Sequence, residues 1–239
     1  MSSSRQLSQP AIIVVIPCFN ERDFISGIVT KTRKHVDRVI VVDDGSTDDT
    51  AEVARAAGAE VISHKARKGA GAASKSGFEA AKANNTDVLI TLDGDGQHNP
   101  DEIPRLLSAI LPNKADLVIG SRFIKAETNM PRYRKFGIDV ITWLYNLGSR
   151  VKITDSQSGF RAYSRRLINT VDITEDGFGF SVQVLIQARR KGFRIKEVPI
   201  SCLYHSQSAS LNPVIHGLGV AWSVVKLRLK NFLTAHKLC

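Results

Sequence analysis

The chain has 239 residues, enough for one large α/β domain with a substantial core. Its apolar content of 43% is ordinary for a globular protein, and its net charge of +10 indicates an anionic partner, such as a phosphorylated substrate or an anionic lipid surface. The sequence contains no recognisable nucleic-acid-binding module, so no nucleic-acid partner is expected. Its three cysteines, Cys18, Cys202 and Cys239, are widely spaced, which argues against a disulfide framework and fits a reducing compartment.

Strands and helices alternate through the first half of the chain. Apolar runs rich in Val and Ile predict strands at 11–16, 38–42, 60–63 and about 88–92. Helices are predicted at about 20–34, 47–57, 72–83 and 101–110, with Asn20 capping the first, Ser46 or Thr47 capping the second and Gly58 closing the second. This alternation with short loops predicts a parallel, doubly wound sheet.

The second half continues with fewer strands. We expect a strand at 116–120, an amphipathic helix with a basic start at 131–150, a helix near 180–191, a strand at 193–198 and a last amphipathic helix at about 213–233.

These elements divide the chain into three parts. Residues 1–10 form a tail that is predicted to be disordered, 11–210 the main domain, and 211–239 a C-terminal amphipathic segment. The longest stretch without Asp, Glu, Lys or Arg, Val198 to Val225, is interrupted by polar residues and is not apolar enough to predict a transmembrane helix.

The stretch from Thr91 to His98 organises one edge of this sheet. Asp93 and Asp95, separated by Gly94, directly follow the fourth strand. Ligands of open α/β sheets bind at the carboxyl ends of the strands, and Mg²⁺ or Mn²⁺ is typically held there by one or two carboxylates with phosphate oxygens completing the shell. The stretch therefore predicts a metal and diphosphate site.

Carboxylates also follow two other predicted strands. Glu21 comes after the first strand, and Asp43 and Asp44 end the second. Because these strand ends share one edge of a doubly wound sheet, we expect the acidic groups to converge with Asp93 and Asp95 on one crevice.

Two other interpretations of these loops fail. The stretch starting at Asp93 begins like an EF-hand, but the sixth position is His98 instead of Gly and the twelfth is Pro104 instead of Glu. Residues 69–76 approach a P-loop, but Ser74 stands where the second glycine belongs. With Arg67 and Lys68 beside it, this glycine loop could still attract an anionic ligand, or it could be a solvated basic turn.

Four motifs, in order, resemble family 2 glycosyltransferases of the GT-A fold. They are Pro17-Cys18-Phe19-Asn20-Glu21, the segment Val42 to Asp48, the segment Lys68 to Ala73, and Asp93-Gly94-Asp95. Three further segments, Asp95 to Pro100, Gly120 to Phe123 and Ser158 to Arg161, are similar to dolichyl- or polyprenyl-phosphate hexose synthases, including archaeal ones. The resemblance implies a Rossmann-like, mostly parallel open sheet flanked by helices.

The resemblance also implies a role for each matching residue. Donor-binding residues would be Pro17, Phe19, Glu21, Asp43, Asp44, Lys68, Gly69, Asp93 and Gly94, and metal ligands would be Asp93, Asp95 and Gln97. Arg122, Arg134 and Lys135 would receive the acceptor phosphate, Ser158, Gly159, Phe160 and Arg161 would close the sugar pocket, and Asp95, Arg122 and Arg134 would be catalytic. Gln183 departs from the family, because many relatives place an acidic, sugar-contacting residue there.

The resulting hypothesis is an inverting glycosyltransferase that needs Mg²⁺ or Mn²⁺. It would move a hexose or N-acetylhexosamine from a UDP- or GDP-sugar to dolichyl or polyprenyl phosphate. The product would serve glycan assembly, including N-glycosylation. A phosphate monoester is largely ionised at neutral pH, so no general base is required. One alternative is a soluble glycan or protein acceptor, with Asp155 or Asp176 as base. Another is a protein that binds nucleotide sugars without catalysis.

Membrane contact is the last expectation. The helices at 131–150 and about 213–233 combine basic residues with Trp143, Trp222 and Leu229, as helices at a lipid surface do. They would hold the protein at the cytoplasmic face of the membrane. Alternatively they pack on the sheet, or a partner subunit supplies the membrane anchor.

Overall fold

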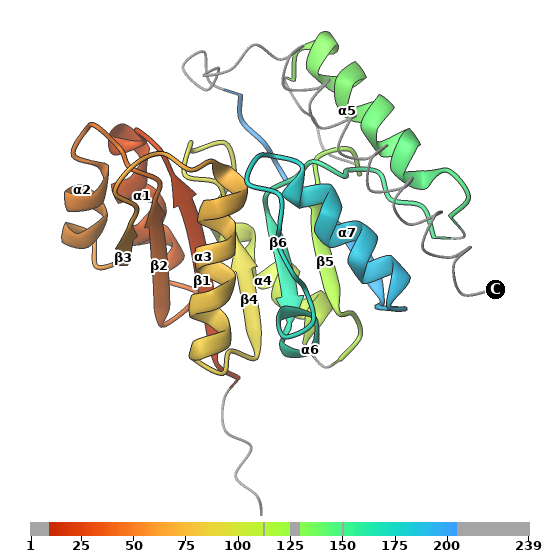
Figure 1. The fold of residues 1–239 in the computed structure, drawn as a ribbon, viewed down its shortest axis with the longest axis horizontal. Helices are drawn as coiled ribbons and strands as arrows, with labels where there is room; N and C mark the ends of the chain where they lie inside the picture. Colours follow the sequence, from red (N-terminus) through yellow and green to blue (C-terminus); the bar gives the residue numbers. More distant parts are fainter. Residues whose placement is uncertain (1–9, 112, 125–129, 150, 205–239) are drawn as a thin grey trace, which may run out of the picture.

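The structure is a computed structural model that describes residues 10–111, 113–124, 130–149 and 151–204. The described chain forms a seven-stranded sheet in the order β3-β2-β1-β4-β6-β5-β7 (Figure 1). Its strands are β1 (Ile12–Cys18), β2 (Arg38–Asp43), β3 (Glu60–Ser63), β4 (Val88–Thr91), β5 (Leu117–Ser121), β6 (Arg161–Ser164) and β7 (Ile195–Pro199). The α-helices are α1 (Arg22–Thr32), α2 (Thr50–Ala56), α3 (Ala70–Ala83), α4 (Ile103–Ile110), α5 (Arg132–Asn146), α6 (Arg165–Ile168) and α7 (Phe180–Arg190), and the 3₁₀ helix η1 (Pro100–Glu102) leads into α4.

The sheet is mostly parallel, as the family resemblance implies, and the parallel pairing expected from the alternation of elements in the first half is confirmed for β1 to β4. The exception is β6, which the sequence did not predict as a strand. This strand runs antiparallel between β4 and β5, pairing Ala162 with Ile90 on one side and with Val118 on the other. Its sequence, Arg-Ala-Tyr-Ser, has no apolar run or clear alternation and therefore gave no strand signal.

The core lies on both faces of the sheet, because alternate residues of each strand point to opposite sides. Val14 and Ile16 of β1 pack with residues of α1 and α4, whereas Ile13 and Val15 pack with residues of α3 and α7. In Figure 1, α3 and α7 lie in front of the sheet and α1 and α4 behind it. Each fully buried Val or Ile stabilises the fold by about 1.5–3 kcal/mol relative to an exposed one.

Two predicted helix starts are wrong, for one physical reason. Asn20 has a φ of 58°, and Glu21 takes the N-cap position of α1. The side-chain oxygen of Asn20 instead accepts a hydrogen bond from the Thr47 N–H at 2.8 Å, and the Ser46 hydroxyl accepts one from the Asn20 N–H at 2.9 Å. These polar side chains therefore join two loops at the sheet edge, and Asp49 takes the N-cap position of α2. The prediction that Gly58 closes α2 is confirmed by its φ of 93°.

α5 is buried only on one side, at Ile141, Thr142 and Tyr145, and the Tyr145 hydroxyl donates a hydrogen bond to the Leu185 carbonyl oxygen of α7 at 3.3 Å. Among the described residues, no helix combines the length and apolar content needed to cross a bilayer. The last predicted helix, at about 213–233, and all of the predicted tail except residue 10 lie outside the described residues.

Candidate active site

The loop after β4 presents its two acidic side chains from a tightly packed base. The carboxylate of Asp95 accepts hydrogen bonds from the Gln97 N–H at 3.0 Å and from Gln97 Nε2 at 2.5 Å. The carboxylate of Asp93 accepts one from His98 Nε2 at 3.2 Å. A Cβ on Gly94 would lie 2.5 Å from the Cys18 sulfur, so a glycine lets this loop pack closely on the end of β1.

The carboxylates predicted to converge do lie close enough to affect one another. Burial, and then the charges of Asp95, Asp48 and Asp93, raise the pKa of Glu21 to about 7. Burial and the charge of Asp93 likewise raise the pKa of Asp95. Burial also acts to raise the pKa of Asp93, but the hydrogen bond from His98 and the nearby positive charges outweigh it, and the pKa lies below its usual value.

Asp43 belongs to the same cluster. The buried thiol of Cys18 has a raised pKa because of its burial and because Glu21, Asp43, Asp93 and Asp95 all act on it. The three strand ends therefore meet around the end of β1, with mutually repelling carboxylates.

The chemistry of this cluster fits Mg²⁺ or Mn²⁺. Within the described residues, no group of three or more His, Cys, Asp and Glu side chains is arranged to hold a metal ion alone. Mg²⁺ usually takes one or two carboxylates and fills its shell with water and substrate phosphates, so Asp93 and Asp95 suit it when a diphosphate is bound. A cation there would also relieve the repulsion that raises the pKa values of Glu21 and Asp95.

The Asp44 side chain organises the neighbouring loop. Its carboxylate accepts hydrogen bonds from the N–H groups of Lys68 at 3.0 Å and Gly69 at 2.7 Å, and from His64 Nδ1 at 2.7 Å. His64 Nε2 in turn lies 2.9 Å from the hydroxyl of Ser76. These hydrogen bonds of the Asp44 carboxylate therefore serve the loop that leads into α3.

The glycine turn, residues 68–72, is not a phosphate cradle of the P-loop kind. The amides of Lys68 and Gly69 donate to Asp44, and those of Gly71 and Ala72 donate to the carbonyl oxygen of Asp176. These N–H groups are therefore already used, whereas the Lys68 side chain is exposed. The adjacent Arg67 guanidinium lies 4.1 Å from the centre of the half-buried Phe19 ring. Pro17, also half-buried, lies in β1 opposite Val42.

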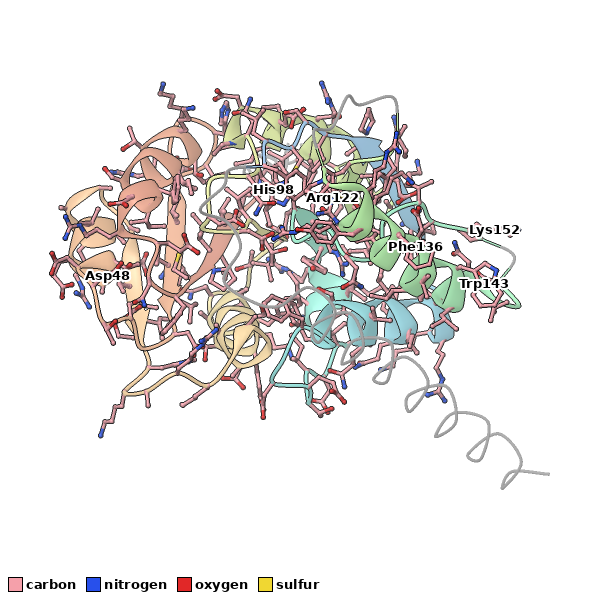
Figure 2. All side chains as sticks on the ribbon, turned by 90° about the horizontal axis from the view of Figure 1, so that it is seen from above. Asp48, His98, Arg122, Phe136, Trp143 and Lys152 are labelled. Atoms are coloured by element: carbon pink, nitrogen blue, oxygen red, sulfur yellow. The ribbon has the colours of Figure 1, made fainter. Side chains whose placement is uncertain are left out.

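Arg122, at the end of β5, is buried and paired. Its Nε and Nη2 donate to the two carboxylate oxygens of Asp155 at 2.7 and 2.8 Å, and its Nη1 donates to the Tyr204 hydroxyl at 2.9 Å. Asp155 is fully buried; burial acts to raise its pKa, but Arg122 holds that pKa below its usual value. Figure 2 shows Arg122 and His98 over the middle of the sheet.

The other two predicted phosphate-binding cations belong to α5. The Arg134 guanidinium lies 5.8 Å from the centre of the Tyr204 ring, so Tyr204 lies close to both arginines. Lys135 forms an exposed ion pair with Asp139, with 2.7 Å between Nζ and the carboxylate oxygen.

The four predicted sugar-pocket residues have different surroundings. Gly159 lies against the metal-loop carboxylate, since a Cβ there would be 2.2 Å from the Asp93 Oδ1. Phe160 is buried, with its ring centre 5.6 Å from that of His98. Ser158 is also buried, and Arg161 donates to three backbone carbonyl oxygens, including that of Ser158 at 2.7 Å. Of the four, Gly159 makes the direct approach to the acidic cluster.

Comparison with known proteins gives the family. The family model described as "Glycosyl transferase family 2" matches residues 13–187. The chain belongs to glycosyltransferase family 2. It is 32% identical to an undecaprenyl-phosphate mannosyltransferase of Micrococcus luteus, over 91% of this chain and 98% of that relative. It is 29% identical to a UDP-N-acetylglucosamine–dolichyl-phosphate N-acetylglucosaminyltransferase of Methanococcus voltae, over 95% of this chain and all of that relative.

A solved structure supports the GT-A-type fold of this glycosyltransferase. Glucosyl-3-phosphoglycerate synthase from Mycobacterium tuberculosis, in complex with Mn²⁺, UDP and phosphoglyceric acid, matches with a TM-score of 0.71 at 24% identity, over 91% of this chain and 78% of that chain.

Sequence reasoning gave no role to three residues that shape the site of this glycosyltransferase. His98 orients Asp93, His64 bridges Asp44 and Ser76, and Tyr204 contacts Arg122. His98 lies within the recognised acidic segment, which was a usable signal. Tyr204 lies after the last apolar strand and 82 residues from Arg122, so no sequence pattern links the two residues, and only the fold brings them into contact.

Proposed function

We propose that the protein is an inverting glycosyltransferase that moves a hexose or N-acetylhexosamine from a UDP- or GDP-sugar to dolichyl or polyprenyl phosphate. The observation that carries this proposal is the cluster of Glu21, Asp43, Asp93 and Asp95 at one sheet edge, with Arg122 close enough to affect Asp93. The two relatives, a dolichyl-phosphate N-acetylglucosaminyltransferase and an undecaprenyl-phosphate mannosyltransferase, support the lipid acceptor. The product would serve glycan assembly, including N-glycosylation.

The donor occupies the edge of β1, β2 and β4. Pro17, Phe19, Glu21 and Asp43 hold the nucleoside, and the exposed Lys68 lies at the same edge. Asp44 and Gly69 act by shaping the glycine turn. Asp93, Asp95 and Gln97, with Gly94 between the two carboxylates, would hold Mg²⁺ or Mn²⁺ when the donor is bound. Positive charge from such an ion would stabilise the departing nucleoside diphosphate.

The acceptor enters from the side of β5 and α5. Its phosphate oxygen is already ionised near neutral pH, because the second pKa of a phosphate monoester is about 6. The protein must therefore hold two anions together, and Arg122, Arg134 and Lys135 provide the positive charge for the acceptor. Attack of that oxygen on the anomeric carbon, opposite the leaving diphosphate, inverts the configuration of the sugar. Gly159 and its neighbours Ser158, Phe160 and Arg161 shape the adjoining sugar pocket.

The surroundings of Asp155 favour this acceptor over one that needs a general base. A base must reach the acceptor hydroxyl and take its proton, but Asp155 is fully buried, has a lowered pKa and is held at both oxygens by Arg122. An acceptor that arrives ionised does not need this step.

An exposed apolar stripe on α5 supports contact with a membrane surface. Tyr133, Phe136 and Trp143 are 59%, 71% and 61% exposed, and Val140 and Leu147 continue the stripe at helical spacing. Figure 2 shows Phe136 and Trp143 along the outer side of α5. Basic residues at the start of the helix would meet anionic headgroups while the stripe enters the interface. The protein would then act at the cytoplasmic face of the membrane, alone or with a partner subunit that anchors it.

The proposal is tested by incubating the protein with labelled UDP- and GDP-sugars, Mn²⁺ and dolichyl phosphate. We expect a labelled, acid-labile product that partitions into chloroform, and its loss in Asp95→Ala. If no donor gives a lipid product, while a soluble phosphorylated or hydroxyl acceptor is glycosylated, the lipid-acceptor assignment is wrong.

A further inference from the structure

Gln183 of α7 is buried and holds a loop through its side-chain amide. It is 5% exposed, and its Oε1 accepts hydrogen bonds from the N–H groups of Thr174 at 3.0 Å and Glu175 at 3.3 Å. Its Nε2 donates to the Thr174 hydroxyl at 2.6 Å. Because both backbone N–H groups need an acceptor, the side-chain atom that they contact must be the amide oxygen of Gln183 and not its nitrogen. The side chain therefore fixes residues 174–176, which we call the brace segment.

The brace segment in turn holds the glycine turn at the start of α3. The carbonyl oxygen of Asp176 accepts from the N–H groups of Gly71 at 2.7 Å and Ala72 at 3.2 Å. No side chain caps this helix, so the carbonyl satisfies N–H groups that would otherwise lack acceptors. The packing is close: a Cβ on Gly71 would lie 2.0 Å from the carbonyl oxygen of Glu175, and one on Gly69 would lie 2.5 Å from that of Asp176.

The other side of the glycine turn meets the proposed donor site. Lys68 and Gly69 donate their N–H groups to Asp44, at the end of β2. The preceding residue, Arg67, covers the ring of Phe19, and a Cβ on Gly45 would lie 2.7 Å from the Arg67 nitrogen. A shift of the brace segment would therefore move the turn, Arg67 and the groups beside them together.

We propose that Gln183 is a positioning residue for donor binding, which acts through the brace segment to hold the glycine turn in its binding conformation. The inference rests on the proposed function, because the donor roles of Phe19, Asp44 and Lys68 belong to it. It also gives a role to the departure from the family pattern. Where many relatives place an acid, this chain uses a neutral amide that supports the loop.

The test compares Gln183→Met with Gln187→Met, two changes of similar volume one helical turn apart. Gln187 also holds the loop, with its Oε1 accepting from the Asp172 N–H at 3.0 Å and its Nε2 donating to the Asp172 carbonyl at 2.5 Å. These hydrogen bonds do not involve the brace segment. Gln187→Met therefore shows what a general loosening of the loop before α7 does without a direct effect on residues 174–176.

The first readout is amide hydrogen exchange, which requires no activity. We expect exchange at Gly71 and Ala72 to become about tenfold faster in Gln183→Met and to stay near the wild-type rate in Gln187→Met. Gln183→Glu should restore slow exchange, since a carboxylate accepts from the same two N–H groups and from the Thr174 hydroxyl. Thr174→Val, which removes only the side-chain contact, should give a smaller increase and supplies the test if Gln183→Met does not fold.

The second readout separates donor binding from the chemical step. We expect Gln183→Met to raise the KM for the sugar nucleotide about tenfold while kcat changes less than about twofold, with Gln183→Glu near wild type. Unchanged exchange at Gly71 and Ala72, or equal effects of Gln187→Met, would overturn the inference. So would a kcat above wild type in Gln183→Glu, because that points to direct contact with the sugar. If the wild-type protein transfers no sugar, the proposed function fails and hydrogen exchange alone decides the positioning role.

Discussion

Gly159→Ala tests the proposed metal site without altering any charged residue. A Cβ at this position would lie 2.2 and 2.3 Å from the two carboxylate oxygens of Asp93, far inside van der Waals contact. The backbone has little freedom to yield, because the Gly159 carbonyl accepts a hydrogen bond from the Thr91 hydroxyl at 2.7 Å. The Asp93 carboxylate must therefore rotate away, and its 3.2 Å contact with His98 is strained or lost.

Two magnitudes follow from this geometry. Overpacking of a core by one methyl group costs about 1–3 kcal/mol, and the Asp93 side chain is 45% exposed, so we expect the lower end of this range; in a chain of this size each kcal/mol lowers Tm by about 2–4 °C. Displacing a metal-binding carboxylate through a neighbouring residue typically weakens metal affinity about 10–100-fold. We therefore expect a moderate loss of stability and a larger loss of metal-dependent donor binding.

Isothermal titration of UDP and GDP, with and without Mn²⁺, measures this effect. The wild-type protein should bind one of the two nucleotides more tightly with Mn²⁺, and Gly159→Ala should lose most of that gain while remaining folded by circular dichroism. Gly27→Ala is the matched control, since a Cβ on Gly27 in α1 meets nothing within 4 Å. If Gly159→Ala binds Mn²⁺ and nucleotide like the wild type, Asp93 does not act as a metal ligand in the way we propose.

Three further outcomes are expected. The folded state keeps a proton on Glu21 up to about pH 7, whereas the unfolded chain loses this proton near pH 4.5. The contribution of Glu21 to the free energy of unfolding is therefore full below pH 4.5 and is lost as the pH rises through 7. Thermal melts of Glu21→Gln in the absence of metal should therefore vary less with pH in this window than those of the wild type, and equal variation would contradict the assignment. Asp155→Asn leaves the buried Arg122 without its counter-charge and should lower the free energy of unfolding, measured by urea titration, by about 3–5 kcal/mol. A loss below about 1 kcal/mol would show that the two side chains do not form a buried ion pair. Replacing Phe136 and Trp143 together by Ser should weaken binding to anionic phospholipid vesicles at least about tenfold at unchanged Tm, and full retention of binding would exclude the α5 stripe as the contact surface.

The parallel half of the fold was predictable because its strands are buried on both faces. The runs from Ile12 to Ile16 and from Val39 to Val42 have almost no polar interruption, and such runs identify strands of a covered sheet. β6 could not be found in this way, since its polar ends, the buried Arg161 and the half-buried Ser164, resemble a loop sequence. Helix starts failed at Asn20 because the local capping preference lost to a hydrogen bond across the sheet edge with Thr47.

The acidic part of the site was more predictable than the basic part. Carboxylates that follow parallel strands converge by topology alone, so the proximity of Glu21 and Asp93 needed no side-chain detail. The surroundings of Arg122 depend on partners 33 and 82 residues away, Asp155 and Tyr204, which no local pattern connects. The same holds for Gln183, whose contacts with the brace segment are set by how α7 packs.

The buried Arg122–Asp155 pair also constrains the chemistry on the acceptor side. The Arg122 guanidinium donates from Nε and Nη2 to the Asp155 carboxylate and from Nη1 to the hydroxyl of Tyr204, whose ring Arg134 approaches. Asp155 neutralises the arginine in the resting protein, and for that reason cannot also take a proton from an acceptor hydroxyl. In the site that we propose, a phosphate would approach the paired Arg122, the Tyr204 hydroxyl and the guanidinium of Arg134, and none of these groups takes up a proton from it, so this side of the site suits an acceptor that brings its own negative charge.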